Sequence, residues 1–472
     1  MKKRILLLAC LMAGLFSGCA DRAVDYDLNG EGTEHAINSK LEQFAEAENW
    51  NAEVTVTAEN GSETHITINA QVVLPDADDM SVVEVEEAVV DGEYKKTLLT
   101  CFFEDGEIYY HDLAHCTREE LEDMITETEN SISDLRNDMA ENPQDYASVN
   151  SEEWFEYQEE QLQEYRAYLQ TAKDTYTLAE DFDMCNEYAG YRDGILYGVV
   201  FQTRNETAQT VSWIDICSMD GVYVGPESLK DFDEVNRMHL DYMWSGESAG
   251  TEAGTNECTL SQEEAKALAD RFVDRSGRTN QICFEESGIL WQGHNLEEME
   301  EEGSYTITDQ ADAVYGYEFV YGTGVDEMAF ASFGGLTAFD QFWTIADLPE
   351  NWYDTDDQIR IIVTDAGIID VRMEYPITID HVTRQVELLS LETVQSILKN
   401  ELTENGSRYD FSQSRYFNTL ELIYFRLKDD NKAGSYSYVP VWCLCAKDRD
   451  TYQHAVLVNA IDGSVIYLQD EI

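Results

Sequence analysis

The sequence predicts an α+β protein, with an N-terminal antiparallel sheet domain that carries an inserted helical hairpin and two helix-on-sheet units after it. Three observations predict this class. Apolar and polar residues alternate in short N-terminal runs, the segment from about 117 to 175 has helical apolar spacing, and a helix-plus-strand pattern occurs twice in the second half. The predicted divisions are a signal segment at 1–18, a tether at 19–34, an N-terminal domain at 35–244, a linker at 245–257, and units at 258–385 and 386–472.

The N-terminal domain begins with a predicted helix over His35–Trp50 and a β-hairpin over Ala52–Leu74. In the hairpin, valines and isoleucines alternate with polar residues on both sides of Asn60-Gly61, a dipeptide typical of tight turns. Further strands are predicted at Val82–Val90, Thr97–Tyr110, Gly194–Gln202 and Thr210–Cys217. Such runs have one apolar face, which indicates an antiparallel sheet covered on one side.

The helical hairpin lies between these strands. Thr117 and Glu120 have the spacing of a capping box, and apolar residues follow at helical intervals up to Met139. The pattern breaks at Asn142-Pro143, and a second helical segment opens after Asn150. Two helices of this length joined by a polar turn predict an antiparallel pair.

The second half contains an internal repeat that follows a Gly/Ser-rich linker. Leu260–Gly277 and Leu389–Gly406 both begin with Leu-Ser, place apolar residues at matching positions and end in glycine seventeen residues after the leucine. These features predict two helices capped by Ser261 and Ser390, each followed by aromatic strands and a late hairpin. We expect the two units to fold together.

The N-terminus has the layout of a secretion signal. Three basic residues precede an apolar run over Ile5–Phe16, which is too short to span a membrane, and Ser17-Gly18 lead to Cys19. Small residues before a cysteine resemble a bacterial lipobox, in which that cysteine is lipidated after cleavage. The sequence therefore predicts a lipoprotein anchored through Cys19 to the outer face of the cell membrane.

The repeat also carries a family resemblance. Its helix opens Ser-x-Glu-Glu-Ala, and its strands end in Tyr-Val-Pro-Val-Trp and an Ala-Ile-Asp-Gly hairpin, which resemble PepSY-like domains over about Thr259–Gln469. The whole layout is similar to uncharacterised cell-envelope lipoproteins of Firmicutes that carry such domains. The resemblance implies helix-on-sheet modules that bind peptides or protein surfaces, in some members to restrain a peptidase or a kinase ectodomain. It implies no catalytic residues and no cofactor.

Charge narrows the range of partners. The formal net charge is -65, so the chain lacks the clustered Lys and Arg that nucleic acid requires. The same charge repels anionic lipid, which leaves the lipid anchor as the expected membrane contact. We expect a protein or peptide partner at the cell envelope. Eight cysteines other than Cys10 and Cys19 permit either disulfides or buried free thiols.

Two segments contain weak candidates for metal ligands. Asp25, Asp27 and Asn29, followed by a glycine, fit the start of a calcium loop, but Ala36 stands where such a loop needs Glu, and an ordinary linker turn is the favoured interpretation. His111 and His115 lie near Asp112 and Cys116, where the alternative is a loop with ordinary histidines. The sequence has no HExxH, Walker A or GxSxG motif.

These observations favour non-catalytic binding or regulation outside the membrane. One alternative is a metal-dependent envelope hydrolase that uses the region of His111 and His115. Another is a solute-binding lipoprotein, which requires a ligand-sized cleft between domains.

Overall fold

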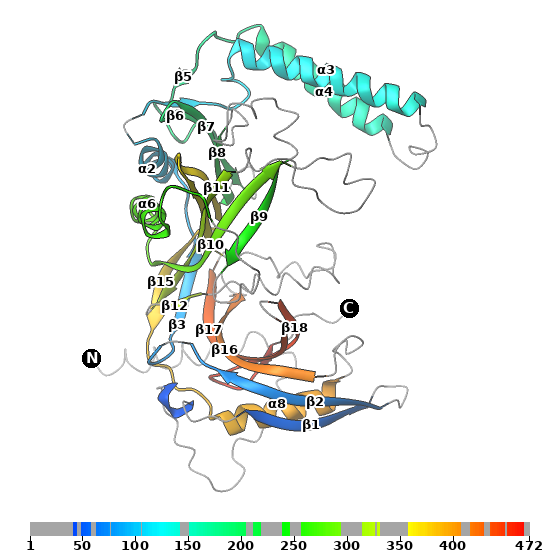
Figure 1. Ribbon diagram of the computed structural model, residues 1–472, viewed down its shortest axis with the longest axis vertical. Helices are drawn as coiled ribbons and strands as arrows, with labels where there is room; N and C mark the ends of the chain where they lie inside the picture. The colour runs from blue at the N-terminus through cyan, green and yellow to red at the C-terminus, as the bar shows by residue number, and fades with distance from the viewer. Residues whose placement is uncertain are drawn as a thin grey trace, which may run out of the picture.

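The protein is described by a computed structural model, which shows a mixed α+β fold made mostly of sheet (Figure 1). The structure describes residues 41–44, 49–57, 63–75, 77–104, 106–141, 151–203, 211–218, 238–245, 256–293, 314–325, 328–330, 357–406, 416–428, 435–448 and 451–466. The expected signal segment, the tether and most of the predicted linker lie outside these ranges.

The first sheet combines strands from both ends of the chain. Its described strands run in the order β1, β2, β16, β17, β18 and β19, and β3 pairs with both β15 and β17. All pairs are antiparallel except β2 with β16. The bounds are β1 Trp50–Thr57, β2 Glu63–Val73, β3 Val82–Glu87, β15 Ile377–Thr383, β16 Tyr416–Lys428, β17 Ser435–Asp448, β18 Thr451–Asn459 and β19 Val465–Ile466.

The second sheet contains the middle of the chain. Its described order is β5, β4, β6, β7, β8, β14, β13, β11, β10 and β9, and β12 pairs with β11. The bounds are β4 Ile108–Tyr110, β5 Thr177–Leu178, β6 Glu187–Arg192, β7 Ile195–Thr203, β8 Val211–Ser218, β9 Met238–Ser245, β10 Gln281–Gly293, β11 Val314–Val325, β12 Met328–Ala329, β13 Gln358–Thr364 and β14 Gly367–Glu374.

Helices cover one face of each sheet. Helices α2 (Gly92–Phe103) and α6 (Gln262–Arg275) lie side by side on the second sheet (Figure 1), where Phe102 and Phe272 pack edge to face. Helix α8 (Leu391–Asn405) packs on β1 and β18 of the first sheet, and a short 3₁₀ helix, η1 (Leu41–Phe44), contributes to the same core. The apolar side chains on these helix faces are buried against the sheets, because removing apolar surface from water is favourable.

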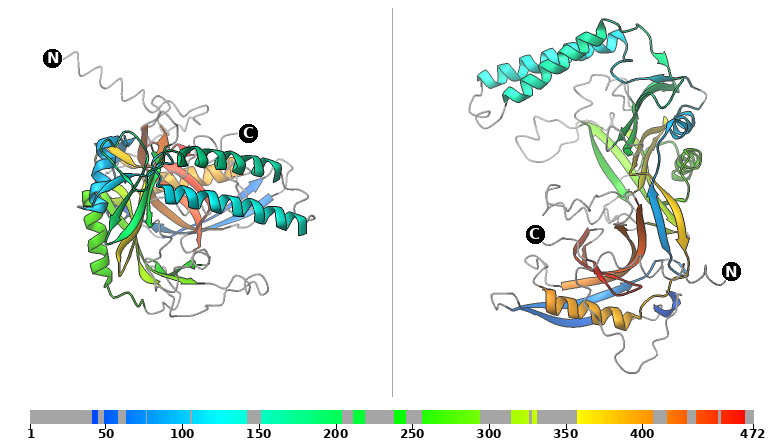
Figure 2. Two further views of the ribbon diagram at one scale, coloured as in Figure 1. Left: turned by 90° about the horizontal axis from the view of Figure 1, so that it is seen from above. Right: turned by 180° about the vertical axis from the view of Figure 1, so that it is seen from behind.

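A long pair of helices extends from the second sheet. Helices α3 (Arg118–Glu141) and α4 (Ser151–Leu169) pack against each other and project away from the body (Figures 1 and 2). This pair, named the arm below, confirms the predicted helical hairpin. The predicted capping box at its start is also present.

The two sequence repeats have the same order of elements in the structure. Helix α6 is followed by β10, β11, β13 and β14, and helix α8 by β16, β17, β18 and β19, each as an antiparallel series. Ser261 and Ser390 cap the helices as predicted. Helix α2 begins a third series, β4, β6, β7 and β8, which the arm interrupts. Strands β8 and β14 pair, so two such series form one sheet.

Several expectations differ from the structure. Thr97–Tyr110 was predicted as a strand, but most of it belongs to α2 and only Ile108–Tyr110 is a strand. Leu98, Leu99 and Phe102 have helical spacing and are buried, and Asp91 caps the helix by accepting from Tyr94 N–H at 2.9 Å. The predicted helix at residues 35–50 is wrong at its end, because Trp50 begins β1.

The sheets also cross the expected divisions of the chain. Strands β1, β2 and β3 from the predicted N-terminal domain complete the sheet of the second unit, whereas β4 to β9 join the sheet of the first. Ser245, placed in the linker, ends β9, which pairs with β10. Strand pairs between residues far apart in the sequence leave no pattern in neighbouring residues. The sequence therefore predicted separate domains where the structure has shared sheets.

Candidate functional site

The candidate site lies at the base of the arm, where β4 ends and α3 begins. Thr117 caps α3, and its N–H donates to Glu120 Oε2 at 2.7 Å while its hydroxyl donates to the same oxygen at 2.9 Å. The Glu120 N–H donates to Thr117 Oγ1 at 3.3 Å. This reciprocal capping turns the Glu120 carboxylate back toward the loop that precedes the helix.

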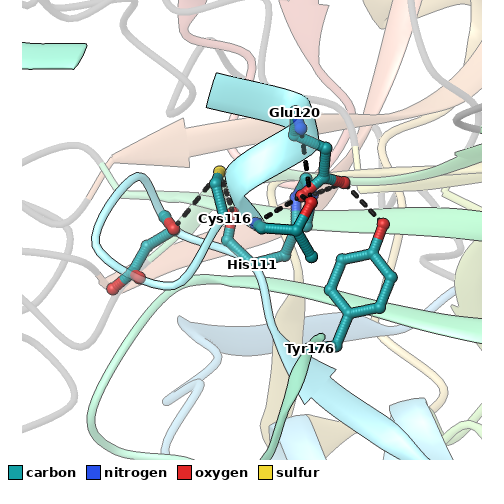
Figure 3. A network of polar contacts seen from close by, with 6 residues as sticks. His111, Cys116, Glu120 and Tyr176 are labelled. Atoms are coloured by element: carbon teal, nitrogen blue, oxygen red, sulfur yellow. Dashed lines mark hydrogen bonds and ion pairs between the residues drawn. The ribbon is translucent and has the colours of Figure 1, made fainter. Parts of the chain in front are cut away.

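In that position Glu120 meets two further side chains. His111 Nε2 lies 3.1 Å from Glu120 Oε1, and the Tyr176 hydroxyl donates to the same oxygen at 2.5 Å. Figure 3 shows both side chains pointing toward this carboxylate. Cys116 lies beside them, and the donor atoms of His111, Cys116 and Glu120 all lie within 4.8 Å of one another. We call these three residues the His-Cys-Glu cluster.

The cluster has perturbed acidities with identifiable causes. Burial by itself would raise the pKa of Glu120, but hydrogen bonds from His111, Tyr176 and Thr117 outweigh it and lower the pKa to about 2. Burial raises the pKa of Cys116 to about 12, and the carboxylates of Glu120, Glu187 and Asp112 add to the increase. Burial and the bond to Glu120 also raise the pKa of Tyr176. Glu120 is therefore a stable anion and Cys116 a protonated thiol.

The structure separates the two histidines that the sequence places near each other. His111 faces Glu120, whereas His115 Nδ1 pairs with Asp112 and its ring lies 4.9 Å from the ring of Tyr110. His115 therefore lies outside the cluster. Asp25, Asp27, Asn29 and the lipidation candidate Cys19 lie outside the described residues.

The sequence analysis did not single out Glu120 or Tyr176 as site residues. Glu120 had a signal, because a capping box directs its glutamate back toward the residues before the helix, where Cys116 and His111 lie. Tyr176 had none. It returns to the site only because the arm folds back on itself, so that the Arg118 N–H donates to the Lys173 carbonyl at 2.8 Å.

The arm itself is strongly acidic. Helices α3 and α4 contain fifteen Asp and Glu residues and three arginines. Each arginine has an acidic partner: Arg136 lies 3.1 Å from Glu159 and Arg166 pairs with Glu129 across the two helices, and Arg118 lies 3.1 Å from Asp174, in the segment after α4. The basic groups therefore hold the arm together, while most of its carboxylates face solvent.

A second group of charges lies on the sheet face opposite α2 and α6. Asp370 and Asp215 lie on the paired strands β14 and β8, and Arg372 Nε is 3.9 Å from Asp215 and 2.8 Å from Glu374. Burial raises the pKa of Asp370 to about 6, with a further increase from Asp215. Burial also raises the pKa of Asp215.

The eight cysteines within the described residues are free thiols, which settles the alternative left open by their even number. Cys443 and Cys445 are fully buried on one face of β17 and pack among apolar side chains. They form part of a core, as expected for small apolar residues at this spacing.

Comparisons with known proteins give little further information. No family model matches the chain, and no curated protein matches it. Among solved structures, the chain is similar to an uncharacterised protein from Eubacterium rectale, with 12% sequence identity and a TM-score of 0.37, over 89% of this chain and 94% of that one. Among the described residues, no helix is both long and apolar enough to cross a membrane.

Proposed function

We propose that this chain is a membrane-anchored extracytoplasmic protein that binds a basic protein or peptide and does not modify it chemically. The observation that carries the proposal is the arm, a projecting helical pair whose three arginines are each paired with a carboxylate of this chain. An exposed surface with one sign of charge attracts an oppositely charged partner and accelerates their encounter. The arm therefore suits a basic partner.

The arm also offers apolar surface for such a partner. Of its side chains, Leu121, Ile132 and Leu162 are buried, whereas Trp154 and Phe155 are only half-buried and Tyr157 is 56% exposed. Phe155 lies under the Arg136 guanidinium of the other helix, 5.0 Å from ring centroid to Cζ, whereas the exposed part of Tyr157 remains available. Exposed aromatic side chains are common anchors in protein interfaces.

The remaining parts of the proposal concern the location and the repeated units. Cys19 would hold the protein at the outer face of the membrane, which matches the lipobox-like run before it. The two units that resemble PepSY-like domains would form part of the binding body. Their repeated order of one helix and four antiparallel strands supports this reading without identifying a ligand.

Binding can be tested by neutralising the arm. We propose the triple variant Glu122→Gln, Glu127→Gln, Glu156→Gln, which changes exposed acids outside the three ion pairs of the arm's arginines. A matched control changes three exposed acids of the body: Glu63→Gln, Glu263→Gln and Glu404→Gln. Full-length wild type and both variants would be crosslinked to partners on intact cells, and captured proteins would be quantified at low and high salt.

The proposal expects one basic partner that the wild type and the body variant capture equally and that the arm variant captures several-fold less. Capture should weaken with salt, because exposed charges are screened. Equal loss in both triple variants would show a nonspecific charge effect. Undiminished capture by the arm variant would exclude the arm as the binding surface.

A second candidate function is a metal-dependent envelope hydrolase, which the His-Cys-Glu cluster favours. Such an enzyme needs a bound ion with an open coordination position that activates water. Purified protein with one equivalent of Zn²⁺ would be assayed against peptide and ester substrates. Turnover that a chelator abolishes and fresh Zn²⁺ restores would support this candidate over simple binding.

A further inference from the structure

The base of the arm combines three donor types that zinc prefers: an imidazole nitrogen, a thiol sulfur and a carboxylate oxygen. We propose that His111, Cys116 and Glu120 bind one Zn²⁺ ion, which fixes the first turn of α3 to the loop that follows β4. The metal binding stands on the cluster itself. Only its effect, a fixed direction of the arm, rests on the proposed function.

The distances between the donor atoms are close to those of a coordination shell. Zinc binds nitrogen, oxygen and sulfur at about 2.0 to 2.3 Å, so the edges of its tetrahedron are roughly 3.3 to 3.8 Å long. His111 Nε2 and Glu120 Oε1 are already 3.1 Å apart, and the three donor atoms lie within 4.8 Å of one another. Small side-chain adjustments therefore complete the three-ligand arrangement, with water in the fourth position.

The carboxylate is held in place by groups that do not compete with the ion. Glu120 Oε2 accepts from the Thr117 N–H and hydroxyl, which leaves Oε1 toward His111. The Tyr176 hydroxyl, 2.5 Å from Oε1, can keep its hydrogen bond because a carboxylate oxygen has more than one lone pair. Hydrogen-bonded support of this kind orients metal ligands in known sites.

The surroundings favour a cation. The carboxylates of Asp112 and Glu187, like that of Glu120, raise the pKa of the Cys116 thiol and so contribute negative charge near the cluster. The thiol contacts the carbonyl oxygens of His111 at 4.0 Å and of Asp112 at 3.6 Å, and S–H is a weak donor. Little is lost when these contacts are replaced by a metal bond.

Binding also requires a proton to leave. The Cys116 S–H bond breaks as the Zn–S bond forms, the proton passes to solvent, and the ion gives up bound water molecules. The proton that His111 Nε2 donates to Glu120 moves to Nδ1 through solvent, so that the neutral ring offers the Nε2 lone pair, and Glu120 is already ionised. No oxidant or reductant takes part. Affinity should therefore rise with pH, as for other thiolate ligands.

The test uses Co²⁺ as a spectroscopic substitute for Zn²⁺ on the full-length protein under reducing conditions. Cobalt bound by thiolate in tetrahedral geometry gives a near-ultraviolet charge-transfer band and strong visible absorption. Wild type should show both with one equivalent, and Zn²⁺ should displace the cobalt. Cys116→Ser should remove the charge-transfer band. His111→Ala and Glu120→Gln should weaken Zn²⁺ binding at least about tenfold, since loss of a ligand exceeds typical effects of its supporting groups.

Two matched variants serve as controls. Cys283→Ser changes a cysteine of intermediate exposure outside the cluster, and His115→Ala changes the neighbouring histidine that faces Asp112. Both should bind Co²⁺ with the wild-type spectrum. Thermal melts of each metal-free variant would establish that the protein is folded, and Cys116→Ala provides a second variant if the serine destabilises it.

Absence of metal binding, or a weak spectrum without a thiolate band, would overturn the inference. The inference would also fail if Cys283→Ser or His115→Ala lost as much metal binding as the variants of the cluster. The outcome is independent of partner capture: a metal-free arm that still captures a basic partner leaves the proposed function intact, and a metal-bound arm that captures nothing leaves the metal site intact.

Discussion

Thr117 and Glu120 hydrogen-bond to each other in both directions across the first turn of α3. This contact does more than begin a helix, because the same carboxylate also accepts from His111 and Tyr176. Three segments of the chain therefore meet at one side chain: the loop after β4, the start of the arm and the segment after it. Glu120 links the direction of the arm to the second sheet.

Glu120→Gln should destabilise this junction at neutral pH by about 1 to 2 kcal/mol, in the range of lost caps and charged hydrogen bonds. The folded pKa is lowered to about 2, so the stabilisation is present above the unfolded pKa near 4.5 and is lost as pH falls through about 2. The difference between wild type and variant should shrink in acid. Urea unfolding at pH 7 and pH 3 measures it, with the exposed Glu119→Gln as control.

Asp370→Asn should stabilise the protein at pH 7.5. The folded pKa of Asp370 is raised to about 6, above its unfolded value of 3.8, so ionisation opposes folding and the native state gains stability as pH falls from above 6 toward 3.8. The asparagine side chain does not ionise, so the variant lacks this dependence of stability on pH. Melting temperatures between pH 4 and 7.5 should converge at the acid end. A larger difference at pH 4 than at pH 7.5 would contradict the assignment, and the exposed Asp380→Asn serves as control.

Gly406→Ala should destabilise the protein by about 1 to 3 kcal/mol through overpacking, because an added Cβ would lie 2.6 Å from Val56 Cγ2. The variant Val56→Ala should restore part of the loss in a double mutant. Gly277→Ala provides the contrast: its φ of +88° makes any side chain strained, so Val56→Ala should not relieve it. Denaturant midpoints of the single and double variants measure the coupling.

Asp357→Asn should destabilise the protein by about 3 to 5 kcal/mol, the range for breaking a buried ion pair. Asp357 and Arg278 pair with side-chain exposures of 2% and 3%, and Thr323 also donates to Asp357. Arg372→Gln, in a pair that is 51% and 31% exposed, should change stability by about 0 to 1 kcal/mol. Chemical denaturation measures the free energy of unfolding of both variants. Similar losses in the two would contradict the expectation that a buried ion pair matters more than an exposed one.

Cys19→Ala should prevent lipid attachment and release the protein from the membrane or leave its signal uncleaved. The reason is the lipobox-like run that precedes the cysteine. Metabolic labelling with a fatty acid, followed by separation of membrane and medium, measures the effect. Labelling of the variant at the wild-type level would refute the anchor, and Cys10→Ala is the control inside the signal.

Local patterns predicted local structure well. The capping boxes at Thr117 and Ser261, the hairpin of β1 and β2 and the arm all follow from neighbouring residues. Helix α2 was missed because the largely apolar segment Thr97–Phe103 is also typical of a strand. The pairing of β2 with β16 has no local signal, because the paired residues Ile68 and Phe417 are far apart in the sequence.

The candidate site was predictable only in part. His111 and Cys116 drew attention because imidazole and thiol groups are uncommon in this chain and lie five residues apart. Glu120 could not be separated from the other acids without knowing how the cap orients it. The two glycines that end the repeated helices also differ: Gly277 has positive φ, whereas Gly406, at φ −60°, is needed where α8 meets Val56.

The sharing of each sheet between distant parts of the chain has a consequence for biosynthesis. Strand β2 is complete by Val73, but its neighbour β16 begins only at Tyr416, and β8 waits for β14 in the same way. During synthesis these edges stay unpaired until most of the chain has been made. Such long-range closure slows folding and exposes strand edges to neighbouring molecules. A net charge of -65 makes nascent copies repel one another during that interval.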